Sequence, residues 1–253
     1  MFKMRKILLS VLAVASMVSC NTTGENEFVI NGDAAGINDG TNVYLQKQDS
    51  LGGLVQLDTV KVEKGKFKFE GAIVDPSFHF IQFESKPGEQ LGFIMEEGAI
   101  DITVNKDTIV KSKVTGTPSN DQLAVYYKDA EKIQKKVLDF RTANQEKMAQ
   151  AQASQDTVVS NALMKEYNVL QQETQKEFMD VAVKNIEKNP KSYFSFLLLR
   201  QLMFQPERDM AKIEGYYNKL DEKIKATSEA KKFKKSLDEA SALEKKKAVV
   251  PQQ

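Results

Sequence analysis

Residues 57–71, with the sequence LDTVKVEKGKFKFEG, decide the fold of the first half of the chain. Val60 and Val62 alternate with polar residues before a Lys-Gly pair, and Phe67 and Phe69 do so after it. Alternation with a period of two places apolar side chains on one face of a strand. Glycine in such a polar interruption is typical of a tight turn. The stretch therefore predicts two short strands joined at the Lys-Gly pair.

The same pattern extends in both directions, over residues 28–116. Further apolar runs contain Val43 and Leu45; Phe78, Phe80 and Phe83; and Ile100, Ile102 and Val104. Turn signals separate the runs, among them Asn38-Asp39-Gly40, Gly52-Gly53 and Lys86-Pro87-Gly88. Strands that recur about every 8 to 12 residues indicate an antiparallel β-sandwich or barrel of about seven to nine strands, and we expect the sandwich.

Glycine marks a boundary near residue 116. Of the 13 glycines, 12 lie at or before Gly116 and one, Gly215, lies after it. Glycine suits turns and is costly inside helices, so this asymmetry separates a turn-rich half from a helical half. Residues 20–116 carry 9 basic and 15 acidic groups, whereas residues 117–253 carry 24 and 20. We expect an α+β fold, with the sandwich followed by an all-helical region.

Two long apolar stripes open the helical region, which we place at residues 117–244. Apolar residues follow one another at three- and four-residue spacing from Leu123 to Phe140 and from Val159 to Val181. This spacing is typical of one face of a helix. Residues 149–155 fit either a connection or a continuation of the first helix. Ser119 or Asn120 is expected to cap the start of that helix.

The rest of the region completes a count of four to five helices. Residues 193–204 are apolar on nearly all sides and predict the most buried helix. Residues 213–224 predict a fourth helix, and residues 233–243 a weaker one. The region is expected to pack on itself or on the sheet. Residues 245–253 are expected to form a disordered tail.

The N-terminus predicts export. Lys3, Arg5 and Lys6 precede a run of small and apolar residues from Ile7 to Val18. Twelve residues of helix reach about 18 Å, too short for a membrane core of about 30 Å, so residues 1–19 are interpreted as a signal peptide. Met17-Val18-Ser19-Cys20 then resembles the lipobox of bacterial lipoproteins, which implies acylation of Cys20.

Lipidation would make Cys20 the first residue of the mature protein. The alternative is a secretory signal cut at a small residue, with Cys20 a free thiol. The mature chain has 33 basic and 35 acidic residues, a net charge of −2, since three of the 36 basic residues lie in the leader. Residues 20–27 form a polar tether, which would hold the folded body close to the bilayer. We expect a lipid anchor in the cell envelope, at the outer membrane, with the membrane face left open.

The order of several short motifs resembles a known family. These are Phe28 to Gly32, Leu57 to Gly71, Met95-Glu96-Glu97-Gly98 and Val114-Thr115-Gly116-Thr117 followed by Asn120. They are similar to the domain of unknown function DUF4369, found in Bacteroidetes lipoproteins, often ahead of a thioredoxin-like domain. The resemblance covers about residues 28–124. This chain lacks the thioredoxin-like domain and any Cys-x-x-Cys, so the resemblance implies no thiol–disulfide activity of its own.

Composition excludes several kinds of chemistry. One His and one Cys cannot supply a four-ligand zinc site, and a net charge near zero argues against nucleic-acid binding. His79 is expected to face solvent, opposite Phe78 and Phe80. The pair Glu96-Glu97 could supply an acid and a base, but adjacent strand residues point apart, and a turn before Gly98 is the preferred interpretation. No catalytic, cofactor or metal residue is predicted, and no cofactor.

Lysines crowd the C-terminal region. Nine Lys face four acidic residues between positions 223 and 247, including Lys231, Lys232, Lys234 and Lys235. Such a run could contact anionic lipid headgroups or an acidic partner, but a solvated helix face is the preferred interpretation.

Three functional hypotheses follow from the sequence. The leading one is a non-catalytic, lipid-anchored envelope protein that binds or scaffolds an unknown envelope protein or ligand. The second is an accessory subunit of a periplasmic thiol–disulfide system with a separate thioredoxin-like partner. The third, held below both, is a hydrolase or lyase that uses carboxylates alone.

Overall fold

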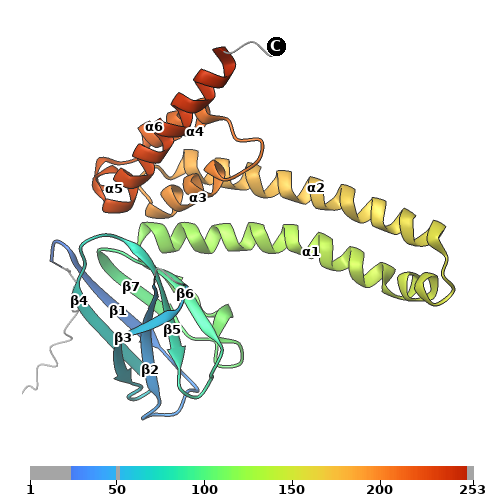
Figure 1. Ribbon diagram of the computed structural model, residues 1–253. Helices are drawn as coiled ribbons and strands as arrows, with labels where there is room; N and C mark the ends of the chain where they lie inside the picture. Colours follow the sequence, from blue (N-terminus) through green and yellow to red (C-terminus); the bar gives the residue numbers. More distant parts are fainter. Residues whose placement is uncertain (1–23, 50–51, 250–253) are drawn as a thin grey trace, which may run out of the picture.

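The computed structural model describes residues 24–49 and 52–249. Eight strands form two facing sheets, followed by six α-helices (Figure 1). One sheet has the order β4-β1-β7-β8, and the other has the order β3-β2-β5-β6. The strands are β1 (Glu27–Asp33), β2 (Asn42–Gln48), β3 (Leu54–Lys61), β4 (Lys66–Ala72), β5 (Ser77–Phe83), β6 (Gln90–Met95), β7 (Gly98–Thr103) and β8 (Lys113–Thr115). The predicted α+β fold and strand number are confirmed.

All strands had been predicted to pair antiparallel, and this prediction is wrong for one pair. β1 pairs with β4 antiparallel but with β7 parallel. A tight hairpin forces antiparallel pairing, but β1 and β7 are separated by the whole of the other sheet, so no turn fixes their relative direction. The quoted stretch also divides between sheets: β3 pairs with β2, whereas β4 pairs with β1. The turn at residues 64–65 therefore carries the chain from one sheet to the other.

The core of the sandwich follows the predicted alternation. Val43 and Leu45 of β2 face Ile81 and Phe83 of β5, with each side chain 4% exposed or less. Burying a side chain of this size contributes about 1.5–3 kcal/mol. Within the β4-β1-β7-β8 sheet, Gly32 of β1 is paired with Phe67 of β4, whose ring lies so close that a Cβ on Gly32 would come within 2.0 Å of it. Glycine at this position is what lets β1 and β4 lie together.

The helical region consists of a long hairpin and a group of shorter helices. α1 (Pro118–Ala153) and α2 (Thr157–Lys188) are followed by α3 (Tyr193–Met203), α4 (Met210–Lys219), α5 (Glu222–Ala226) and α6 (Ser228–Val249); a 3₁₀ turn, η1 (Ile109–Lys111), precedes β8. The residues left open at 149–155 continue α1 to Ala153. Asp156 caps α2 by accepting hydrogen bonds from the backbone N–H groups of Val158 and Val159.

Six helices exceed the four to five predicted for this region. The single helix expected over residues 213–224 is divided into α4 and α5 because Leu220 leaves helical geometry and Asp221 starts a new helix, capping it through Lys223 N–H. α6 runs on to Val249, so the tail predicted at residue 245 is wrong for residues 245–249. Lysine and alanine favour helix, and no proline occurs in this stretch before Pro251. Residues 250–253 lie outside the described part.

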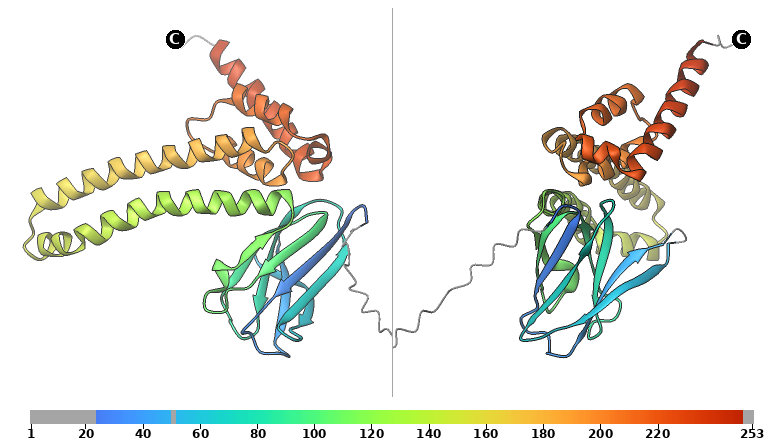
Figure 2. Two further views of the ribbon diagram at one scale, coloured as in Figure 1. Left: turned by 180° about the vertical axis from the view of Figure 1, so that it is seen from behind. Right: turned by 90° about the vertical axis from the view of Figure 1, so that its left-hand side faces the viewer.

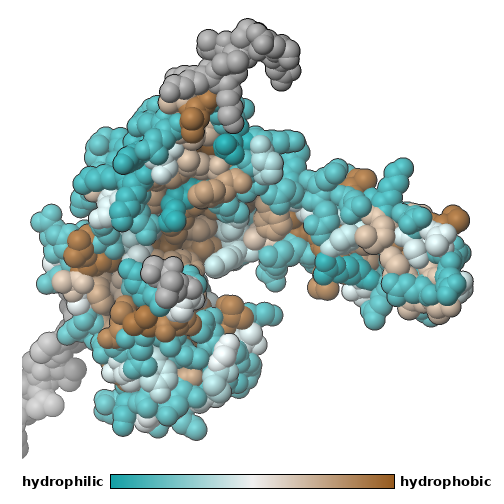
Figure 3. Space-filling model, viewed as in Figure 1, coloured by the Kyte–Doolittle hydropathy of each residue, from teal (hydrophilic) through white to brown (hydrophobic). Residues whose placement is uncertain are grey.

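The shorter helices pack on the base of the hairpin and on one end of the sandwich. Their apolar cluster includes Phe196, Leu199 and Leu237, all fully buried, together with Ile94 from β6. α3, which was predicted to be the most buried helix, contributes seven buried residues out of eleven. In Figure 3, apolar colour gathers where these helices meet the sandwich.

Candidate functional site

A buried polar joint connects the sandwich to the helices. Glu96, which follows β6 and is 9% exposed, accepts hydrogen bonds from the backbone N–H of Ser119 at 2.7 Å and from its hydroxyl at 2.5 Å. The Ser119 oxygen in turn accepts from the N–H of Tyr193, the first residue of α3, at 2.9 Å. Burial raises the pKa of the Glu96 carboxyl, against the opposing effect of the hydrogen bonds from Ser119 and Thr117. The carboxyl thus joins the first turns of α1 and α3 to one strand end.

Asn120 makes the second connection. Its side-chain oxygen accepts from the N–H of Ile94 at 2.9 Å, and its amide donates to the carbonyl of Ile94 at 2.7 Å and to the Thr117 hydroxyl at 2.8 Å. β6 is an edge strand, so these Ile94 groups have no strand partner. Asn120 completes the edge as a further strand would. Ser119 or Asn120 had been predicted to cap α1. Instead Thr117 is the N-cap, and the side chains of Ser119 and Asn120 both bind the sandwich.

Gln122 fixes the base of the hairpin. Its amide donates to the carbonyl of Asn185 on α2 at 3.1 Å and to the hydroxyl of Ser195 on α3 at 3.0 Å. All three residues are buried, with Ser195 fully so. Because polar groups in such a site are costly unless paired, these bonds hold α1, α2 and α3 in one arrangement. The hairpin is therefore rooted in a fixed base.

Beyond this base, the hairpin projects alone. We call residues 134–178 the arm; Figures 1 and 2 show it extending away from the sandwich and the short helices. The full helices span about 54 and 48 Å at 1.5 Å per residue. The described chain begins at Gly24, on the side of the body opposite the arm (Figures 1 and 2).

The two predicted apolar stripes pack against each other along the arm, but they are incompletely covered. Only Ala151, Leu163 and Thr174 are buried among the arm residues. Phe140 and Tyr167, which contact each other across the hairpin with ring centroids 6.0 Å apart, remain half-exposed. Two helices can cover only one side of each stripe, whereas in a bundle further helices cover the rest. The arm thus presents apolar surface that the rest of the described chain, residues 24–49 and 52–249, leaves uncovered.

One face of the arm is nearly free of charge. Two adjacent hollows of about 630 and 300 Å³ lie along it, and Arg141 is the sole charged residue that lines them, although residues 134–178 include twelve charged side chains. Its guanidinium donates to the Tyr167 hydroxyl, and this contact lowers the pKa of that phenol. Leu138 and Met164 stand exposed here at 63% and 50%. The glutamines of the face are Gln134, Gln145, Gln152, Gln171 and Gln175. We call this the uncharged face.

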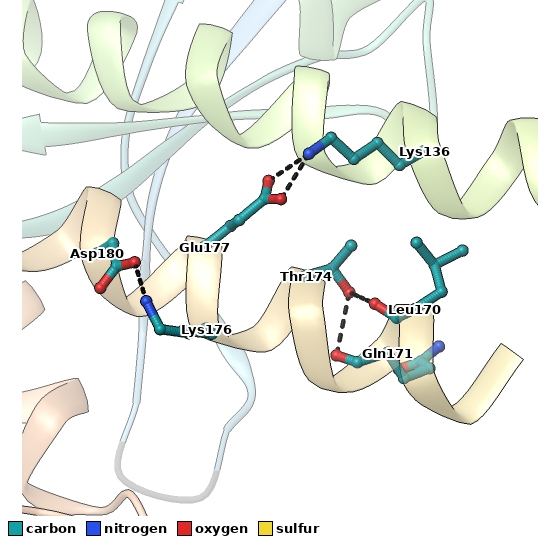
Figure 4. A network of polar contacts seen from close by, with 7 residues as sticks. All are labelled: Lys136, Leu170, Gln171, Thr174, Lys176, Glu177 and Asp180. Carbon is teal, nitrogen blue, oxygen red and sulfur yellow. Dashed lines mark hydrogen bonds and ion pairs between the residues drawn. The ribbon is translucent and has the colours of Figure 1, made fainter. Parts of the chain in front are cut away.

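The opposite face carries the ion pairs. Lys136 of α1 binds both carboxylate oxygens of Glu177 of α2, at 2.5 and 2.7 Å, and Lys176 binds Asp180 at 2.7 Å (Figure 4). The Thr174 hydroxyl donates within its own helix, to the carbonyls of Leu170 and Gln171. Exposed ion pairs contribute about 0–1 kcal/mol each, so these contacts add little to the pairing of the two helices.

His79 is placed differently from its prediction. It does point opposite to Phe78 and Phe80, but it is 6% exposed and faces the sandwich core, next to the ring of Phe93. The predicted inner face of β5 was the wrong one: Phe78 packs toward the helices, which the sequence could not show. Its Nδ1 lies 3.0 Å from the carbonyl of Ser77, which requires a proton on that nitrogen. Burial lowers the pKa of the imidazole, so His79 is a neutral core residue.

The two adjacent glutamates point apart. Glu97 is exposed and its carboxylate lies 3.8 Å from Lys223, whereas Glu96 is buried in the joint. β6 ends at Met95 and β7 begins at Gly98, so the preferred interpretation as a turn holds. Glu96 and Glu97 therefore do not meet as an acid and base pair.

Cys20, with its leader, lies outside the described residues. Lys231, Lys232 and Lys235 are exposed on α6, while Lys234 pairs with Asp238 and Glu214. Within residues 24–49 and 52–249, no cluster of three His, Cys, Asp or Glu side chains could hold a metal ion. In the same residues, no helix has the length and apolarity needed to span a membrane.

Sequence reasoning missed both the joint and the uncharged face. Ser119 and Asn120 carry the residue types of helix caps, and only the position of β6 reveals their other partners. For the arm a signal was present: Gln134, Gln145 and Gln152 recur at multiples of the helical repeat, beside the off-stripe Leu138. Such a pattern indicates a second, uncharged helix face.

These features define an α+β protein in which a β-sandwich carries a rooted helical arm. Residues 28–123 match the model of a family described as Domain of unknown function (DUF4369). The match covers the sandwich and ends in the first turns of α1, so the arm and the later helices lie outside it. No curated protein and no solved structure was found to match the chain.

Proposed function

We propose that this protein is a non-catalytic, lipid-anchored scaffold of the cell envelope, which binds an envelope partner through its arm. Acylated Cys20 would hold it at the outer membrane. The observation that carries the proposal is the arm itself: a hairpin rooted by buried hydrogen bonds, with exposed Leu138 and Met164 on a face almost without charge. Large exposed apolar surface on a soluble element is typical of interaction sites.

The position of the anchor agrees with this role. The described chain begins on the side of the body opposite the arm, so an N-terminal anchor would leave the arm directed away from the membrane (Figure 2). Glu27 is the first residue of β1, and its N–H binds the carbonyl of Gly24, so the predicted tether of residues 20–27 would be confined to the few residues between Cys20 and Gly24. A tether this short would keep the body near the bilayer and leave the arm free to meet a partner.

Catalysis finds no support in the candidates raised from the sequence. His79 is buried in the core, and both carboxyl oxygens of Glu96 accept hydrogen bonds from Ser119 in the joint. Neither side chain is therefore exposed to a substrate. Turnover by the purified protein that is lost in His79→Ala or Glu96→Ala would contradict this part of the proposal. The accessory role in thiol–disulfide exchange rests on the family resemblance alone, and no described residue favours it.

The experiment compares envelope proteins retained by three forms of the immobilised mature protein. Leu138→Glu with Met164→Glu places charge on the uncharged face. Val125→Glu with Val169→Glu is the matched control, since these valines are similarly exposed, at 55% and 47%, and helix periodicity turns them away from that face. We expect a set of proteins retained by wild type and control and lost from the first variant. Equal sets from all three would contradict an arm function.

Mass spectrometry of the mature N-terminus tests the anchor separately. We expect Cys20 as the first residue, carrying acyl chains. An unmodified Cys20, or cleavage elsewhere, would overturn the anchor and the outer-membrane address together.

A further inference from the structure

We infer that two copies of this protein pair through the uncharged faces of their arms, forming a four-helix bundle. The inference deepens the proposed function, on which it rests for the role of the arm, by naming a second copy of this chain as an occupant of the face.

The first reason is that the apolar stripe between the two arm helices is only partly covered. Phe140, Tyr167 and Leu170 belong to the stripe between the two helices but remain half-exposed, and Leu138 and Met164 stand beside it. A second pair of helices would cover this side, as in four-helix bundles, where each helix has two neighbours. The face is thus shaped as half of a bundle.

The second reason is chemical self-complementarity. A strongly charged partner would find almost no counter-charge, because Arg141 already donates a hydrogen bond to the Tyr167 hydroxyl and no other charged residue lines the two hollows. Glutamine amides, in contrast, both donate and accept hydrogen bonds, so a row of glutamines can bind an identical row. Bringing two such faces together meets no like-charge repulsion beyond the two arginines.

The third reason is size. Residues 134–153 of α1 and their α2 counterparts offer a face about 30 Å long and about 20 Å wide, from the rise and diameter of helices. Two such faces would bury about 1,200 Å² in total, at the lower end of stable interfaces. We therefore expect a reversible dimer rather than an obligate one.

Analytical ultracentrifugation of the full mature chain tests the inference. The chain carries Cys20→Ser, so that neither acyl chains nor a disulfide can associate the copies. Up to about 100 µM, a range that detects weak reversible pairing, we expect a monomer–dimer equilibrium. Leu138→Glu with Met164→Glu should weaken it at least tenfold, and Val125→Glu with Val169→Glu should leave it within twofold.

The readout separates folding from pairing. All four positions are exposed, so the substitutions should leave the fold of the protomer intact, which circular dichroism checks. A monomer throughout the range overturns the inference, and so does a dimer that the control variant disrupts equally. Either result concerns purified protein only, and the proposed function keeps its own test against envelope proteins.

Discussion

Asn120→Ala should uncouple the sandwich from the helices at a large cost in stability. Asn120 is 1% exposed and makes three hydrogen bonds, two of them to the backbone N–H and carbonyl of Ile94. Ile94 is itself fully buried, so truncating Asn120 to Ala would leave the N–H and the carbonyl of Ile94 without these hydrogen bonds. Each such group costs about 1–3 kcal/mol. For the two groups together we expect a loss of about 2–6 kcal/mol in the free energy of unfolding.

Urea unfolding followed by circular dichroism measures this loss, with Asn144→Ala as the matched control. Asn144 is also on α1, but it is half-exposed and makes one bond, to the carbonyl of Phe140 in its own helix. The control should change stability by less than about 0.5 kcal/mol, as exposed substitutions usually do. A loss below about 1 kcal/mol for Asn120→Ala, or equal losses for both variants, would refute the account of the joint.

Three further predictions concern packing and titration. Gly32→Ala should lower the free energy of unfolding in urea by about 1–3 kcal/mol, because the Phe67 ring occupies the place of the new Cβ. The control Gly215→Ala, in the open middle of α4, should be neutral or stabilising. An unchanged stability of Gly32→Ala would contradict the close packing of β1 on β4. The raised pKa of Glu96 makes its stabilising contribution complete below about pH 4.5 and lost as pH rises through the folded pKa, so Glu96→Gln should flatten the fall in stability on the alkaline side of pH 4.5. The lowered pKa of His79 has the opposite sign, so its contribution to stability is complete above pH 6.5 and is lost as pH falls through the folded pKa. His79→Gln should therefore flatten the fall in stability on the acid side of pH 6.5. Curves of unfolding free energy against pH that respond to neither variant would rule out both assignments.

The sequence predicts elements better than their partners. The alternation of Val43 with Leu45 and the stripe through Leu163 identify a strand and a helix correctly, because periodicity reports which face of an element is apolar. Periodicity does not report what covers that face. His79 was therefore predicted to face solvent, since Phe78 and Phe80 were equally good candidates for the core. The helical residues whose cluster Phe78 joins begin only at α1, beyond the end of the sandwich.

The candidate site shows the same limit more strongly. Glu96 and Ser119 belong to the joint only because the end of β6 meets the start of α1. The arm required knowledge that its two stripes pack on each other while the remaining helices return to the sandwich. What local sequence did contain was the spacing of the arm glutamines, because position on a helix follows directly from residue number.

Photo-cross-linking in growing cells tests the central claim that the arm is a binding surface. A photoreactive residue is placed at Gln145 on the uncharged face or, as control, at Lys132 on the charged side of the same helix. We predict adducts from Gln145, including one of twice the protein's own mass, and none of comparable yield from Lys132. Absence of adducts from Gln145, or the same adducts from both positions, would contradict the claim.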